Sequence, residues 1–384
     1  MPMISGSGHF RFQYEPTKLQ LPPGARLKNA HGLVVDDDGA LILTYERSST
    51  DDAHCLARWR ADDGYTEGVA FGPVGVMCSG TPHGLRLAHE AGTPFLYHVN
   101  VREKPLKPTP SSKALGLVEP HGTKMTLDGT ILWTITGPPR SDVRGFLPFK
   151  PTWFAAPPGS PYVYLSDGYG SCNVHAYTAR DGAYTGYSFG GGHGFGKSCR
   201  GCTAAGRFNN PHAVNWDSRV RKLVVSDRRN KRHQYFDIVI PSRNQEALTR
   251  ERESPARWSL RRGHSSASAQ QAAAAAAASE TADARMEALV PPNATFSSMF
   301  TIPELAAPNH LRVAPDGTHA VVADLLGPVA ILDGRNSLVS LVNVSGLLGA
   351  EGHEHPHDAL MLPNGDLVVG TWSPGRLSYW RWLG

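Results

Sequence analysis

The chain has 384 residues, of which 40% are hydrophobic and 19% charged, so it can bury a sizeable core. The formal net charge is +4 with no dense basic stripe among aromatic residues, and we expect no nucleic-acid partner. No apolar run approaches the roughly 20 residues of a membrane-spanning helix, and we expect no membrane partner. Forty glycines and 30 prolines without a collagen period indicate tight turns between short strands.

The start of the chain and its cysteines bear on the compartment. Residues 1–8 lack the charged-then-apolar pattern of a signal peptide. Five cysteines are an odd number, which does not suit a complete disulfide framework. We therefore expect a cytoplasmic or otherwise intracellular soluble protein. Cys199 and Cys202 form a single CxxC pair, which favours a flexible loop with a local disulfide over a structural zinc.

A repeat runs along the chain. Its clearest copy begins at Pro211-His212, continues as a short apolar strand, turns, and ends in the second apolar strand Lys222–Asp227. Turn pairs such as Asp128-Gly129 between apolar runs are strong hairpin signals. Similar units start at residues 31, 83, 152, 212, 310 and 357. The repeat therefore predicts six strand-rich units.

Two stretches widen the spacing of these units. Residues 101–120 are rich in Lys, Pro and Ser and read as an insert in the second unit. Residues 241–293 hold mixed charge, Ser, Gln and the run Ala272–Ala278, and we expect a disordered, low-complexity insert between units four and five. Without them the period falls near the ~40–50 residues of a four-stranded blade. We predict an all-β fold, a six-bladed β-propeller that forms one domain over residues 1–384.

The ends of the chain suggest how the ring closes. A propeller cut open would leave unpaired strand edges. The last unit has three strands of its own and ends with Arg376–Leu383. His9–Glu15 alternates apolar and polar residues, as a half-buried strand does. We predict that this N-terminal strand pairs as the outer strand of blade six.

Three histidines share one position in the repeat, just after a proline and before the inner strand. They are His83, His212 and His357, in blades two, four and six. Alternate blades lie about 120° apart, so three imidazoles would point at the central channel. Neutral imidazole suits zinc, and three protein ligands leave an open position. The alternative is that Pro-His is only the repeat's consensus, with each His bonded to local backbone.

The same position holds His31, Thr152 and Asn309 in blades one, three and five. His31 is thus a rival ligand. We leave it out of the predicted site because it breaks the alternation of blades.

Three further side chains follow strand ends that face the same channel. Tyr169 ends Ser166-Asp-Gly-Tyr169, where a nearby cation would lower its pKa and let it act as an acid or base. Arg228 and Arg47 occupy matching places in blades four and one and would bind a carboxylate or an oxyanion. The alternatives are a packing aromatic and two surface salt bridges.

Several motifs resemble those of NHL-repeat six-bladed propellers, and among these the peptidyl-α-hydroxyglycine α-amidating lyases, or peptidylamidoglycolate lyases. They are Pro82-His83-Gly84-Leu85, Ser166-Asp-Gly-Tyr169, Phe208-Asn-Asn-Pro-His212, Ser226-Asp-Arg-Arg-Asn230 and Pro356-His357-Asp358. The resemblance covers about residues 30–384, apart from the inserts. It implies cleavage of a carbinolamide C–N bond in a small-molecule or peptide-derived substrate, giving an amide and glyoxylate.

The resemblance also implies site residues. A catalytic zinc would be bound by His83, His212 and His357. Tyr169 would move a proton, and Arg228 and Arg47 would hold the substrate carboxylate. A structural calcium in the channel would use Asp358 and the backbone carbonyl of Leu85.

Two other functions stay open. The first is a non-enzymatic NHL propeller that binds a protein or another ligand through its face or through residues 241–293. The second is a lactonase-like or other hydrolase. Such enzymes draw on carboxylate and Asn metal ligands, and no matching acidic set stands at the blade openings.

Overall fold

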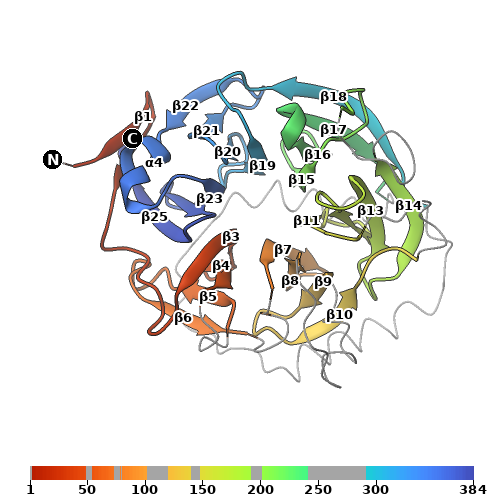
Figure 1. Ribbon diagram of the computed structural model, residues 1–384, viewed down its shortest axis with the longest axis horizontal. Helices are drawn as coiled ribbons and strands as arrows, with labels where there is room; N and C mark the ends of the chain where they lie inside the picture. Colours follow the sequence, from red (N-terminus) through yellow and green to blue (C-terminus); the bar gives the residue numbers. More distant parts are fainter. Residues whose placement is uncertain are drawn as a thin grey trace.

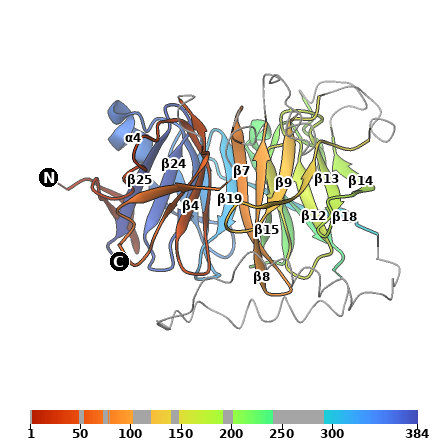
Figure 2. The same ribbon diagram turned by 90° about the horizontal axis from the view of Figure 1, so that it is seen from below.

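The computed structural model describes residues 2–48, 54–72, 78, 80–101, 120–139, 148–191, 201–240 and 291–384. These residues form six antiparallel sheets that surround one axis (Figure 1). Seen from below, the blades stand side by side around the ring (Figure 2). The predicted all-β, six-bladed propeller is confirmed. None of the helices in the described part of the chain has the length and apolar character needed to cross a membrane.

Within each blade the strands follow one another outward from the axis (Figure 1). Blades one and two contain β3 (Leu27–Val35), β4 (Leu41–Arg47), β5 (Leu56–Trp59), β6 (Gly68–Phe71), and β7 (Pro82–Glu90), β8 (Thr93–Asn100), β9 (His121–Met125), β10 (Ile131–Ile135). Blades three and four contain β11 (Trp153–Ala155), β12 (Tyr162–Ser166), β13 (Asn173–Thr178), β14 (Tyr184–Gly190), and β15 (Pro211–Asp217), β16 (Lys222–Asp227), β17 (Arg232–Ile238), β18 (Ala294–Thr301). Blade five contains β19 (Pro308–Val313), β20 (Ala320–Asp324), β21 (Val329–Leu332) and β22 (Leu338–Val342).

Blade six closes the ring. Its own strands are β23 (Pro356–Met361), β24 (Leu367–Thr371) and β25 (Arg376–Trp382). The N-terminal strand β2 (Phe10–Tyr14) pairs with β25, as predicted, and β1 (Ile4–Ser7) adds a fifth strand outside it. The sequence analysis did not anticipate β1. Both chain ends therefore lie at this blade (Figure 1). A short helix, α4 (Val344–Leu348), precedes the blade.

The apolar core lies between neighbouring blades. Between blades three and four, for example, Tyr164, Phe208, Trp216 and Phe236 are at most 5% exposed and pack in one cluster. Burying one such side chain contributes roughly 1.5–3 kcal/mol. Because these contacts hold the ring together from between the blades, the inner strands can carry polar side chains on the axis.

A β-bulge recurs at the start of five inner strands. The register shifts there in β3, β7, β15, β19 and β23. In β15, for example, Pro211 lies opposite Asp227 and Ala213 opposite Ser226, so His212 has no opposite residue. A bulge leaves its extra residue unpaired and redirects the side chain. The bulge thus explains why the residue after proline is the one presented to the axis.

A second device fixes the loop that leads into the blade. The aspartate after the second strand accepts a hydrogen bond from the backbone that precedes the inner strand. The pairs are Asp167 with Lys150 (2.6 Å), Asp227 with Asn209 (2.6 Å) and Asp324 with Ala307 (2.9 Å). The recurring aspartates are therefore structural, and they position Tyr169 and Arg228, which follow them closely.

The position expected for one of the two inserts needs correction. The stretch 241–290 lies outside the described residues, but β17 ends at Ile238 and β18, of the same blade, begins at Ala294. It therefore connects the third and fourth strands of blade four, and does not separate blades four and five. The stretch 102–119, which also lies outside the described residues, falls between β8 and β9.

The cysteines also differ from expectation. Cys55 and Cys78 form a disulfide, with Cα atoms 5.1 Å apart, and Cys172 is disulfide-bonded as well. Cys202 is free and buried, so the local CxxC disulfide is not formed. Cys199 lies outside the described residues. Bonded cysteines are typical of oxidising compartments, whereas the sequence analysis expected an intracellular protein.

Candidate metal centre

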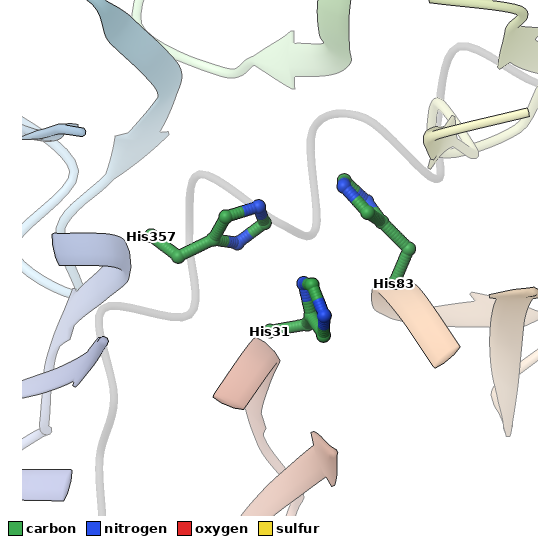
Figure 3. Close-up of side chains that lie close together, drawn as sticks. All are labelled: His31, His83 and His357. Atoms are coloured by element: carbon green, nitrogen blue, oxygen red, sulfur yellow. The ribbon is translucent and has the colours of Figure 1, made fainter. Parts of the chain in front are cut away.

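Three buried histidines converge on the axis from blades one, two and six. A ligand atom of His31, one of His83 and one of His357 all lie within 4.8 Å of one another, and each side chain is at most 2% exposed. Figure 3 shows the three rings, carried by β3, β7 and β23, pointing toward one another. A group of buried imidazoles is a donor set that suits zinc and related divalent metals.

His212 lies against the same group. Its ring centroid is 4.9 Å from that of His83 and 5.0 Å from that of His357. The set predicted from sequence and the set that includes His31 therefore share the pair His83–His357. They differ in the third imidazole, which comes from blade four in one set and from blade one in the other.

The backbone of blades three and five, which carry Thr152 and Asn309 in place of a histidine at this repeat position, fixes two of the rings. The Nδ1 atom of His83 lies 3.0 Å from the carbonyl oxygen of Thr152, and that of His212 lies 3.2 Å from the carbonyl oxygen of Asn309. A carbonyl oxygen only accepts, so Nδ1 carries the proton in both rings. The lone pair of each neutral ring is then on Nε2. Such outer hydrogen bonds fix the tautomer and orientation of metal-binding histidines.

Burial keeps these rings neutral. It lowers the pKa of His83 to about 3, aided by the charge of Arg228. Burial likewise lowers the pKa values of His31, His212 and His357 well below the usual range, aided by neighbouring imidazoles and by Arg228 or Lys28. Neutral imidazole is the form that binds metal, so at neutral pH no proton must be displaced.

Some ring nitrogens have no partner. Both ring nitrogens of His31 and the Nδ1 atom of His357 are buried without a hydrogen bond to any residue that the structure describes. Leaving a buried polar atom unsatisfied costs about 1–3 kcal/mol. Coordination of a cation would use the lone pairs, so the residues present fit a metal site.

Tyr169 places its hydroxyl over two of the histidines. The oxygen lies 3.2 Å from Nε2 of His83 and 3.0 Å from Nε2 of His212. The side chain is 37% exposed, although both imidazoles are buried. Tyr169 therefore connects the histidine group to solvent. The sequence analysis assigned it this position, and its catalytic role stays a prediction.

Arg228 lies beside Tyr169. Its Cζ atom is 5.6 Å from the centroid of the Tyr169 ring. Its Nε donates to Oδ1 of Asn210 and one terminal nitrogen donates to Oδ1 of Asn309, at 2.9 and 3.0 Å. Two amides thus orient the guanidinium. Its charge contributes to the lowered pKa values of His83, His212 and His357.

Asp358, the predicted calcium ligand, is held by Arg312, His310 and the backbone of Leu33. Its Oδ2 accepts from Arg312 at 2.8 Å and from the backbone N–H of Leu33 at 2.7 Å, and its Oδ1 lies 2.6 Å from Nε2 of His310. Burial would raise the pKa of this carboxyl, but Arg312 and His310 outweigh it and the pKa is lowered. Calcium requires six to eight oxygen ligands. With a guanidinium and an imidazole at its oxygens, Asp358 does not fit a calcium site as it lies.

The remaining predicted residues lie in the strands as follows. Leu85 is buried in β7 opposite His98. Arg47 ends β4 opposite Leu27, and its carboxylate-binding role stays a prediction.

The sequence analysis missed His310, whose ring stacks on Trp153 with centroids 4.6 Å apart. The segment Pro308-Asn309-His310 was recognised only as the start of a repeat.

No protein-family model matches the sequence, and no curated protein does. Among solved structures, virginiamycin B lyase from Staphylococcus aureus aligns with 11% identity over 90% of this chain and 79% of its own, at a TM-score of 0.46. A protein of unknown function from Bacteroides thetaiotaomicron aligns with 9% identity over 99% and 76%, at 0.49. The β-propeller domain of Cps50 (Swd1) from Myceliophteria thermophila aligns with 12% identity over 100% and 95%, at 0.46.

Proposed function

We propose that this propeller is a divalent-metal-dependent carbon–nitrogen lyase that acts on N-acyl-α-hydroxyglycine compounds. The single observation that carries the proposal is the convergence of buried imidazoles, the Tyr169 hydroxyl and the Arg228 guanidinium at one place on the axis. His83 and His357 belong to both sets of three histidines and would hold the ion in either case. The third imidazole is His212 in the set that the resemblance implies. It is His31 in the group whose ligand atoms lie within 4.8 Å of one another.

The groups around the histidines match the parts of such a substrate. An N-acyl-α-hydroxyglycine carries a hydroxyl, a carboxylate and the amide nitrogen on the same carbon. Zinc, when bound, would supply Lewis-acid polarisation of that hydroxyl. Arg228, oriented by Asn210 and Asn309, would pair with the carboxylate.

The proton balance gives Tyr169 its role. The substrate hydroxyl loses its proton, the C–N bond breaks, and the amide nitrogen gains a proton. The carbon becomes the aldehyde carbon of glyoxylate. The Tyr169 hydroxyl lies within hydrogen-bond distance of two imidazole nitrogens and is partly exposed. It is therefore placed to pass one proton between the substrate and the buried group.

The test is turnover of N-benzoyl-α-hydroxyglycine by the zinc-loaded protein, with benzamide and glyoxylate both quantified. We expect equal amounts of the two products. Tyr187→Phe is a matched control, because that hydroxyl bonds to Ala294 and lies outside the histidine group. Release of neither product by a protein that has bound zinc would exclude this reaction and favour a non-enzymatic propeller that binds a ligand or protein.

A further inference from the structure

We propose that His31, and not His212, is the third ligand of the metal centre, and that His212 instead positions the hydroxyl of Tyr169. This inference rests on the proposed function, because it presumes a divalent ion at the histidines. It concerns the two sets of three histidines that share His83 and His357. His31 and His212 come from blades one and four, which lie on opposite sides of the ring (Figure 1). The two sets of three histidines therefore share the pair His83–His357 and take the third imidazole from opposite sides of the ring.

His31 is buried against His83 and His357. Its ring centroid lies 4.8 Å from that of His83 and 4.7 Å from that of His357. The side chain is 1% exposed, and in the described part of the chain neither ring nitrogen has a hydrogen-bond partner. Buried polar groups in proteins are almost always paired, and an exception needs an explanation. Coordination of a cation through one nitrogen explains why the fold turns this imidazole toward the axis.

His212, in contrast, has a hydrogen-bond partner at each ring nitrogen. Its Nδ1 donates to the carbonyl oxygen of Asn309, and its Nε2 lies 3.0 Å from the Tyr169 hydroxyl. An Nε2 that accepts from Tyr169 has its lone pair occupied. His212 thus needs no metal to complete its hydrogen bonds, whereas His31 does.

The Tyr169 hydroxyl has a single proton to donate. Its oxygen faces the Nε2 atoms of both His83 and His212, and both are acceptors because Nδ1 carries the proton in each ring. One hydroxyl proton serves only one acceptor. Donation to His212, at the shorter distance, leaves the lone pair of His83 free for the ion. The ion is then bound by His31, His83 and His357, and His212 acts on Tyr169 as a positioning residue.

The experiment measures cobalt binding, with no substrate present. Metal-free wild-type protein and the variants His31→Gln, His31→Ala, His212→Gln and His212→Ala are dialysed against Co²⁺. The bound metal is counted, and the visible Co²⁺ spectrum is recorded. His319→Ala, at a histidine paired with Asp316 away from the axis, is the control. Circular dichroism of each variant excludes misfolding. Each histidine is also replaced by glutamine, because glutamine keeps a polar side chain in the site and gives a folded variant if the alanine variant does not fold.

We expect the wild type, the control and both His212 variants to bind about one Co²⁺ per chain with the same spectrum. We expect the affinity of the His31 variants for Co²⁺ to fall by at least roughly 100-fold, which is more than is usual when a residue outside the ligand set is changed. The reverse result, with Co²⁺ lost in the His212 variants and retained in the His31 variants, would overturn the inference and leave the proposed lyase intact. Equal loss in both pairs would also overturn it. A wild-type protein that binds no Co²⁺ would overturn the inference and the proposed function together.

Discussion

The hydroxyl of Tyr169 lies 3.0 Å from the Nε2 atom of His212, which joins a partly exposed side chain to a fully buried one. Tyr169 sits in the loop fixed by Asp167, and His212 occupies a β-bulge of β15. Both positions arise from the repeat. A loop in blade three and a β-bulge in blade four, both features of the repeat, therefore bring these two side chains together near the axis.

Replacing Tyr169 by Phe tests the proton-transfer role. We expect Tyr169→Phe to bind metal as wild type does, because neither set of three histidines includes the tyrosine. Turnover of N-benzoyl-α-hydroxyglycine should fall by about 10²–10⁴-fold, the usual contribution of general acid–base catalysis. Metal content and steady-state rates are measured on the same preparation. Wild-type turnover in this variant would exclude Tyr169 from the chemistry.

Replacing Arg228 by Lys tests carboxylate binding. The guanidinium is oriented by Asn210 and Asn309, and lysine cannot reproduce this planar geometry. We expect KM for the hydroxyglycine substrate to rise about tenfold, equivalent to ~1.4 kcal/mol of binding free energy. The exposed neighbour Arg229 offers a matched control, Arg229→Lys. If both variants keep the wild-type KM, Arg228 does not bind the carboxylate.

The pH dependence of stability follows from histidines outside the proposed metal ligands. Burial lowers the pKa of His98 and of His233 to about 3, from an ordinary value of 6.5. Between these values the unfolded chain binds protons that the folded chain does not, so the free energy of unfolding falls as the pH falls below 6.5.

We expect His233→Gln to reduce this slope by about one proton, or ~1.4 kcal/mol per pH unit. Urea unfolding at several pH values between 4 and 7 provides the measurement. A slope identical in wild type and variant would show that His233 titrates normally in the folded protein.

The ion pair at Asp358 should be energetically coupled. Asp358 is fully buried, and its contact with Arg312 is 2.8 Å long. Removing one partner leaves the other charge unpaired, which costs about 3–5 kcal/mol. We expect Asp358→Asn and Arg312→Met each to be strongly destabilising, and the double variant to be less destabilised than their sum. Additive effects in urea unfolding would contradict this coupling.

The sequence predicted the fold well because each blade repeats the same local signals. The Pro-His starts, the Asp-Gly turns and the alternation of His9–Glu15 all reflect backbone chemistry within a few residues. The outer strand Ala294–Thr301 was missed because it is separated from its partner β17 by more than 50 residues of low complexity. Pairing over such a distance leaves no local signature.

The site was predicted in part. Alternation of blades selected His83, His212 and His357, but the adjacent blades one and two both bring an imidazole to this group, and the rule gave no reason to expect His31 so close. The partners of Asp358 were missed for a similar reason. Arg312 and His310 lie more than 40 residues away in the neighbouring blade, and only the closed ring brings them to the carboxylate.

The central claim is that the buried histidines bind a divalent metal, and His357→Ala tests it most directly because His357 belongs to both sets of three. The measurement is the zinc content of wild type, His357→Ala and the control His319→Ala after zinc loading and gel filtration, by elemental analysis. We predict about one zinc per chain in wild type and control, as for a single three-histidine site, and none in His357→Ala. No zinc in the wild type, or equal zinc in wild type and His357→Ala, would contradict the account.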